Sequence, residues 1–96
     1  MPGGKRGSIT APIVLVKIEP EYTEDARRAR ITGTVILRIE VGTDGKARNI
    51  SIRQSLGLGL DERAVEAVQQ WKFLPGKQNG QPVVTVALVE VNFRLL

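Results

Sequence analysis

The chain has 96 residues, of which 42% are apolar, and its 14 basic and 10 acidic residues give a net charge of +4. A chain of this length supports one domain with a single hydrophobic core. It contains no cysteine and no histidine, which excludes disulfides, thiolate nucleophiles and imidazole bases and removes the usual ligands of zinc and haem. We therefore expect no cofactor and no metal. No apolar run approaches the roughly 20 residues that span a bilayer, and the amino terminus has no signal-peptide pattern.

The positive charge raises the question of nucleic-acid binding. The basic residues are spread along the chain, and only Arg27, Arg28 and Arg30 lie close together. No aromatic residues alternate with these arginines to stack on bases. A solvated helix face is the simpler interpretation of the trio, and we predict that nucleic acid is not a partner.

The N-terminal part of the chain predicts a linker followed by an extended segment. Residues 1–11 begin with a glycine-rich stretch and predict a flexible linker, so the domain is expected over residues 12–96. The segment from Ile13 to Glu19 alternates weakly and suits a short strand or an extended arm, which Pro20 ends. The pattern leaves open whether this arm joins a sheet.

A short helix and a hairpin come next. Residues 22–30 have the order of a helix, with Thr23 as its cap, acids in the first turn and bases in the last. Residues 33–41 alternate between apolar and polar side chains, which is the period of a half-buried strand. Gly42–Gly45 supplies a turn, and residues 46–55 form the returning strand.

The stretch from Leu60 to Pro75 predicts the helix around which the domain is organised. Its apolar residues recur at steps of three and four and form one stripe: Leu60, Ala64, Ala67, Val68 and Trp71. Asp61 is the expected N-cap, because its carboxylate can accept hydrogen bonds from the unpaired amides of the first turn. Pro75 cannot continue a helix, so the helix must end before it. Trp71 and Phe73 are expected to bury against a sheet beneath the helix.

After a polar loop, residues 83–95 predict a long final strand. Its second half alternates cleanly between apolar and polar residues, but its first half carries apolar residues on both faces, at Val84, Val86 and Leu88. An edge strand exposed in this way invites pairing with a partner. Together the elements predict an α+β domain in two layers, a three-stranded antiparallel sheet with two helices on one face. The expected order is strand or arm, helix, strand, strand, helix, strand.

Several short motifs carry a resemblance to a known family. They are Pro20-Glu21-Tyr22, Gly33-Thr34-Val35, Asp44-Gly45, Ser55 with Gly57, Leu60-Asp61 with Ala64 and Ala67-Val68, Trp71-Lys72-Phe73-Leu74-Pro75, Gly80 with Pro82-Val83, and Val89-Glu90-Val91-Asn92-Phe93. In this combination, from about Pro20 to Leu95, the sequence resembles the C-terminal domain of the TonB energy-transducer family. Thr23 stands where that family usually has a proline.

The resemblance implies a function in transport across the cell envelope. A domain of this kind lies in the periplasm and is tethered through a proline-rich spacer to an inner-membrane helix, which works with a proton-driven ExbB–ExbD motor. It binds the TonB box of an outer-membrane transporter by strand addition and transmits force to it. The implied peptide-binding residues lie on the last strand and before the first helix: Val83, Val84, Thr85, Val86, Ala87, Leu88, Glu90, Asn92, Pro20 and Tyr22.

Two other functions are alternatives to this one. A structural interaction module would pair its C-terminal edge strand with a second copy and form a homodimer. An enzyme would need paired groups of matched pKa, but the acids occupy cap, turn and solvent-facing positions, so we predict no catalysis. The pattern does not say which backbone amides of the last strand point outward, so both Thr85 with Ala87 and Val86 with Leu88 stay open.

Overall fold

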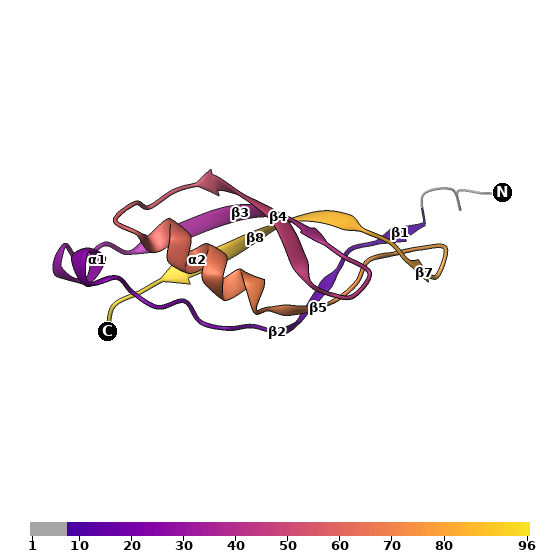
Figure 1. Ribbon diagram of the computed structural model, residues 1–96, viewed down its shortest axis with the longest axis horizontal. Coiled ribbons are helices and arrows are strands. Elements are labelled where there is room, and N and C mark those ends of the chain that lie inside the picture. The colour runs from indigo at the N-terminus through magenta and orange to yellow at the C-terminus, as the bar shows by residue number, and fades with distance from the viewer. Residues whose placement is uncertain (1–7) are drawn as a thin grey trace.

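The computed structural model describes residues 8–96. In chain order its elements are β1 Ile9–Thr10, β2 Ile13–Val16, α1 Glu24–Arg28, β3 Gly33–Val41, β4 Ala47–Gln54, α2 Leu60–Gln69, β5 Lys72–Leu74, β6 Lys77–Gln78, β7 Gln81–Pro82 and β8 Thr85–Phe93. Most of the predicted linker, residues 1–7, lies outside the described residues. The molecule is elongated, with α1 near one end and β1 and β7 near the other (Figure 1).

The main sheet is antiparallel and has the strand order β4-β3-β8. β3 and β8 pair in unbroken register, from Gly33 opposite Phe93 to Val41 opposite Thr85. α2 lies across one face of this sheet (Figure 1), and α1 packs Ala26 into the same core. Every second residue of β3 is buried there: Val35, Leu37, Ile39 and Val41. The predicted α+β fold is therefore confirmed, and so is the period-two alternation from which it was predicted.

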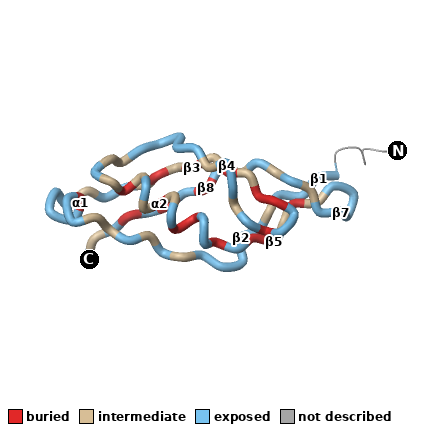
Figure 2. Tube along the Cα trace, viewed as in Figure 1, coloured by how far each residue is buried: buried red, intermediate tan, exposed pale blue. Residues whose placement is uncertain are grey.

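The stripe on α2 is buried as predicted. Its apolar residues Leu60, Ala64, Ala67 and Val68 are in the core, and Trp71 is buried just beyond the helix end. Burying a large aromatic side chain stabilises a fold by roughly 2 to 3 kcal/mol. In Figure 2 the buried positions accordingly gather under α2 and along β3 and β8.

Asp61 does not cap α2, so that prediction is wrong. The N-cap is Gly59, which has a φ of 80° and makes no side-chain cap bond. The Asp61 carboxylate instead turns back toward the preceding loop and accepts hydrogen bonds from the Ser55 hydroxyl and the Leu56 and Gly57 amides. Burial alone would raise the pKa of Asp61, but these three hydrogen bonds outweigh it and hold the pKa below its ordinary value of 3.8.

The turn between β3 and β4 is also a docking point for β5. Gly45 has a φ of 79°, and its carbonyl accepts a hydrogen bond of 2.9 Å from the Phe73 amide. A Cβ atom on Gly45 would overlap the Phe73 carbonyl oxygen. Glycine is therefore required here both for the backbone conformation and for the close approach of β5.

The sequence did not predict β5 or the two small sheets that accompany the main one. β2 pairs with β5 in a two-stranded antiparallel sheet, which is where the segment from Ile13 joins the fold, and β1, β6 and β7 form a third sheet. The predicted Asn-Gly turn lies between β6 and β7, where Asn79 and Gly80 have φ values of 53° and 82°. This pair of positive φ values is typical of a tight hairpin turn.

α1 forms as predicted. Thr23 is its N-cap, and the Thr23 hydroxyl accepts a hydrogen bond of 3.1 Å from the Ala26 amide. Arg27, Arg28 and Arg30 are exposed to solvent, in agreement with a solvated helix face. In the described part of the chain, neither α1 nor α2 has the length and hydrophobicity of a membrane-spanning helix.

Candidate functional site

β8 is an edge strand with one free side. Its only strand partner among residues 8–96 is β3, and it ends the order β4-β3-β8. A free edge presents unpaired backbone N–H and C=O groups to which another extended chain can bind. The opposite edge strand, β4, is less regular, because its pairing with β3 shifts register twice. Bulges of this kind obstruct the addition of a further strand, so β8 is the better template.

Backbone alternation identifies the amides of β8 that point to its free side. The N–H and C=O groups of one residue in a strand point to the same side, and those of the next residue point to the other side. The Gly42 amide, directly after β3, donates to the Lys46 carbonyl at 3.0 Å and so points toward β4. The backbone N–H and C=O groups of the odd-numbered residues of β3 therefore point toward β8. Those of their partners point back toward β3, and these partners are Thr85, Ala87, Val89 and Val91. The amides that face the free side belong to Val86, Leu88, Glu90 and Asn92.

The side chains of β8 separate into two faces. Val89, Val91 and Phe93 are buried under α2, while the even-numbered residues lie on the opposite face. Two of these residues are apolar: Val86, which is 54% exposed, and Leu88, which is 63% exposed. Val83 and Val84 precede the strand, so the predicted set of residues continues past the end of the β3–β8 ladder.

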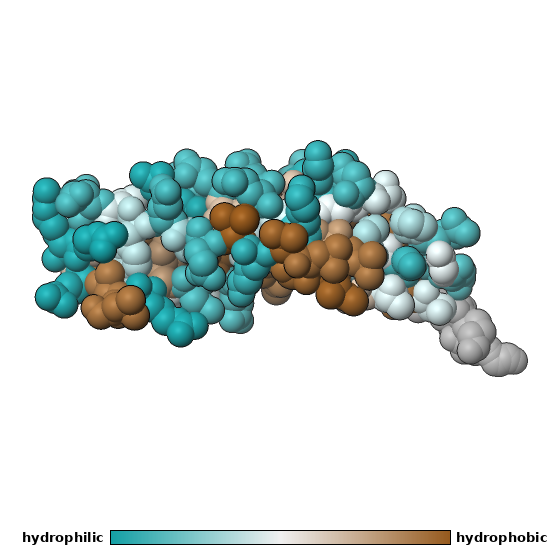
Figure 3. Space-filling model, turned by 90° about the horizontal axis from the view of Figure 1, so that it is seen from below, coloured by the Kyte–Doolittle hydropathy of each residue, from teal (hydrophilic) through white to brown (hydrophobic). Residues whose placement is uncertain are grey.

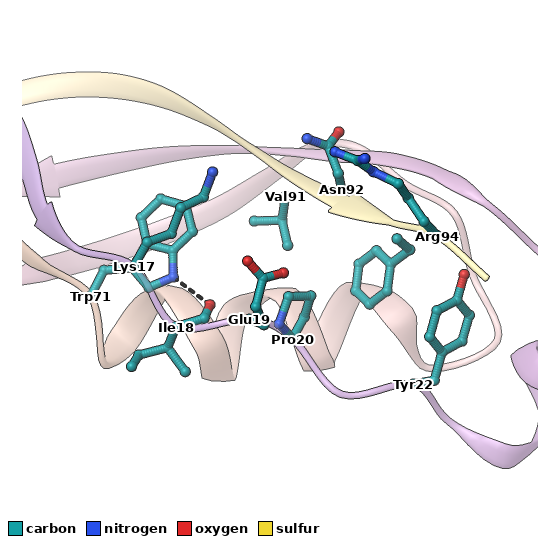
Figure 4. Close-up of a pocket in the computed structure, with 10 residues that line it drawn as sticks. Lys17, Ile18, Glu19, Pro20, Tyr22, Trp71, Val91, Asn92 and Arg94 are labelled. Atoms are coloured by element: carbon teal, nitrogen blue, oxygen red, sulfur yellow. Dashed lines mark hydrogen bonds between the residues drawn. The ribbon is translucent and has the colours of Figure 1, made fainter. Parts of the chain in front are cut away.

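A hollow of about 380 Å³ lies beside the C-terminal end of β8. One side is the extended segment from Lys17 to Tyr22, and the other is the end of the last strand, residues 91–94, with Trp71 closing one end (Figure 4). The hollow thus brings Pro20 and Tyr22 to the same place as Asn92. The other predicted residues lie outside its lining, farther along β8 toward its beginning.

Two hydrogen bonds from aromatic side chains fix the segment from Lys17 to Tyr22. The Trp71 indole N–H donates to the Ile18 carbonyl at 2.9 Å, and the Tyr22 hydroxyl donates to the Ile31 carbonyl at 2.7 Å. The Tyr22 ring also packs edge-on against Phe93, with 5.5 Å between ring centroids. Because both anchors reach into the core, the width of the hollow is set by the packing of the domain.

Charged side chains surround the hollow. The Glu19 carboxylate points into it, and the Arg94 side chain extends along its rim beside Asn92 (Figure 4). The Lys17 ammonium group lies 5.4 Å from the centre of the Trp71 ring, a distance typical of a cation–π interaction. Neither Glu19 nor Arg94 takes part in an ion pair within residues 8–96. Both charges are thus available to a bound chain.

Sequence reasoning did not single out Lys17, Ile18, Glu19 or Arg94. Their only signal was their position beside the Pro20-Glu21-Tyr22 motif and at the end of the last strand. The described residues contain no group of three or more acidic side chains placed to hold a metal ion. The site therefore consists of a strand edge, an adjacent hollow and a few unpaired charges, an arrangement suited to binding an extended peptide.

These features define a small α+β domain whose sheet ends in a free strand beside a hollow. The sequence profile of the family described as Gram-negative bacterial TonB protein C-terminal matches residues 18–95, and the chain belongs to that family. It is 38% identical over 77 residues to Protein TonB of Xanthomonas campestris, covering 79% of this chain and 34% of that protein. It is 33% identical over 84 residues to Protein TonB of Vibrio cholerae, covering 86% and 34%. The chain thus spans about a third of the length of these curated relatives, 34% of each.

The fold is also similar to that of a solved structure. The solution NMR structure of the Pseudomonas aeruginosa TonB CTD has a TM-score of 0.70 and 23% sequence identity to this chain. The similarity covers 90% of this chain and 88% of that chain. It supports the α+β architecture over nearly all of the domain.

Proposed function

We propose that this domain is a non-enzymatic energy-transducing domain that binds the TonB box of an outer-membrane transporter by strand addition. The observation that carries the proposal is the free side of β8, where the amides of Val86, Leu88, Glu90 and Asn92 point outward in a row. An extended peptide beside this edge would accept hydrogen bonds from these amides and donate to the carbonyls of the same four residues. Each such bond contributes roughly 1 kcal/mol net.

The hollow supplies the selectivity that a row of backbone bonds lacks. Alternate side chains of a bound strand point to opposite sides, so some would enter the space between Pro20 and Val91. There they would meet the Glu19 carboxylate and the Arg94 guanidinium. A peptide with polar groups that match these charges would bind more tightly than one without them.

The transporter, the motor and the location of the domain belong to the same proposal. Family membership supports a periplasmic domain that is tethered to the inner membrane and driven by an ExbB–ExbD motor, with the tether in the part of the protein outside this chain. A guest strand that is hydrogen-bonded along β8 suits force transmission, because a pull parallel to the strand is shared by several hydrogen bonds at once. No catalytic step enters this function.

A peptide titration tests the proposal. A synthetic TonB-box peptide is added to the isotope-labelled domain, and the amide resonances are followed, with a scrambled peptide as the control. We expect the largest shifts at Val86, Leu88, Glu90 and Asn92 and in the segment from Lys17 to Tyr22. Shifts confined to α1 and β4, or equal shifts with the scrambled peptide, would overturn the proposed site.

The same edge supports a second candidate, the homodimer. Two copies related by a two-fold axis could pair β8 with β8 and form one continuous six-stranded sheet. The exposed side chains of Val86 and Leu88 would then cover each other. Sedimentation equilibrium with and without the peptide separates the candidates. A monomer at all concentrations excludes the dimer. A dimer that dissociates when the peptide is added would mean that the peptide and the second copy compete for the β8 edge.

A further inference from the structure

The two-stranded sheet of β2 and β5 has an outward face made of apolar side chains. Phe73 is buried, and since neighbouring residues of a strand point to opposite sides, Lys72 and Leu74 point outward. Ile13 lies opposite Leu74, and Val16 lies opposite Lys72. Directly opposed residues share a face of a sheet, so Ile13 and Val16 point outward as well.

Leu15 belongs to the same face. It is two residues from Ile13, and the pairing shifts register between Val14 and Val16, which brings both Leu15 and Val16 to the outer side of the bulge. We call Ile13, Leu15, Val16 and Leu74 the ribbon face. Leu15 is 62% and Ile13 57% exposed. Figure 3 shows apolar side chains gathered on this underside of the molecule, over β2 and β5.

The ribbon face lies in a part of the molecule that carries an excess of exposed apolar side chains. Residues 8–17 and 72–82, which we call the arm, hold six of the twelve exposed large apolar residues of the described chain. Three of the others, Val84, Val86 and Leu88, lie at or before the β8 edge, and the remaining three are Ile52, Leu58 and Leu96. Single exposed apolar residues are common on protein surfaces, but a contiguous group marks an interaction site.

The charges of the arm have one sign. It contains Lys17, Lys72 and Lys77 and neither aspartate nor glutamate. The turn that docks against β5 adds Asp44 and Lys46, whose charges cancel, and Glu19 lies two residues beyond the arm. Lys72 is fixed directly beside the ribbon face by its pairing with Val16. The arm therefore combines apolar surface with a local charge of +3.

We propose that the ribbon face inserts into the surface of a membrane that contains anionic phospholipids. Apolar side chains flanked by lysines match such an interface, because the side chains enter the boundary of the acyl chains while the ammonium groups stay among the anionic headgroups. The end of the arm at β1 and β7 protrudes from the domain, and the ribbon face lies on the underside nearer the middle of the molecule (Figures 1 and 3). A fluid interface can adapt to the outline of this surface, whereas a protein partner would have to match it with a complementary shape. The proposal is independent of the β8 edge.

Vesicle flotation with the 96-residue chain tests this proposal. The chain is floated with vesicles of equimolar phosphatidylcholine and phosphatidylglycerol and with vesicles of phosphatidylcholine alone. We expect binding to the anionic vesicles that falls as sodium chloride rises from about 0.01 M to about 1 M, since the Debye length then falls from roughly 30 Å to 3 Å. Replacing Ile13→Ser and Leu15→Ser together should lower the partition coefficient at least about tenfold. Lys72→Gln should lower it about fivefold.

Ile52→Ser is the matched control, because Ile52 is 44% exposed on β4, outside the arm. It should leave the partition coefficient within about twofold of the parent. The proposal is overturned if the parent does not float with the anionic vesicles, if it binds both vesicle types equally, or if Ile52→Ser weakens binding as much as the double variant. It is also overturned if the double variant dissociates a dimer of the parent without changing vesicle binding, because the ribbon face would then bind a second copy. Thermal unfolding of each variant excludes loss of fold as the cause.

Discussion

Proline at position 88 is expected to separate binding from folding. The Leu88 amide points to the free side of β8, so Leu88→Pro removes no hydrogen bond to β3. The preceding residue, Ala87, is already extended, as a residue before proline prefers to be. Proline is tolerated on the open side of an edge strand. We therefore expect the melting temperature of Leu88→Pro to stay within a few degrees of the parent.

The effect of Leu88→Pro on a bound peptide should be large. The variant lacks one donor, worth roughly 0.5 to 1.5 kcal/mol, and its ring occupies the space into which the amide pointed, which pushes the guest away from neighbouring donors. A total loss of about 2 kcal/mol corresponds to roughly a 30-fold weaker Kd. Isothermal titration with a TonB-box peptide measures this loss. Leu88→Ala is the control, because it shortens the same exposed side chain but keeps the amide.

The neighbouring position should behave in the opposite way. The Ala87 amide points toward β3, where Ala87 lies opposite Ile39 in the ladder. Ala87→Pro removes a ladder hydrogen bond and places the ring against the central strand, which should cost about 3 kcal/mol or more. That is a large part of the stability of a small domain. If Leu88→Pro bound the peptide like the parent, or if Ala87→Pro stayed as stable as Leu88→Pro, the assignment of outward amides would be wrong.

Four further outcomes are expected. Trp71→Ala should lower the free energy of unfolding by about 3 to 5 kcal/mol, and a melting temperature within a degree or two of the parent would contradict its place in the core. Gly45→Ala should cost at least about 2 kcal/mol in urea unfolding, because it combines a positive φ with a backbone clash; an unchanged midpoint would exclude the clash. Because the pKa of Asp61 is lowered on folding, its contribution to stability is present above its ordinary pKa and is lost as the pH falls through the folded value. The parent should therefore lose more stability on acidification than Asp61→Asn, and parallel acid unfolding curves would refute this. Binding to duplex DNA should vanish by physiological salt, and sub-micromolar binding there would overturn the exclusion of nucleic acid.

The elements that the sequence predicts correctly are those with a local period. The alternation of β3 and the stripe of α2 each repeat over at least two turns or strand periods, so neighbouring residues alone define a buried face. β5 has three residues and no period, and it is a strand because it pairs with β2, where Val14 lies opposite Phe73. Asp61 fits the residue preference of an N-cap, but the loop at Gly59 shifts the start of the helix and turns the carboxylate toward Ser55.

The candidate site was predictable in part for the same reason. The excess of apolar residues around Val86 and Leu88 marks the edge strand directly in the sequence. The hollow, however, depends on the approach of residues 17–22 to residues 91–94, which are at opposite ends of the chain. No pattern within either segment encodes that approach. The outward amides likewise follow from the Gly42 hydrogen bond to β4 and not from the side-chain alternation of β8.

The hydrogen bond from Trp71 to Ile18 gives the domain a built-in optical reporter. Trp71 is the single tryptophan of the chain, and its indole N–H is held by the same segment that walls the hollow. A guest that shifts this segment alters the polarity and hydrogen bonding around the indole, to which tryptophan emission responds. Occupancy of the hollow can therefore be followed by intrinsic fluorescence, without a label and without a substitution at the edge that binds.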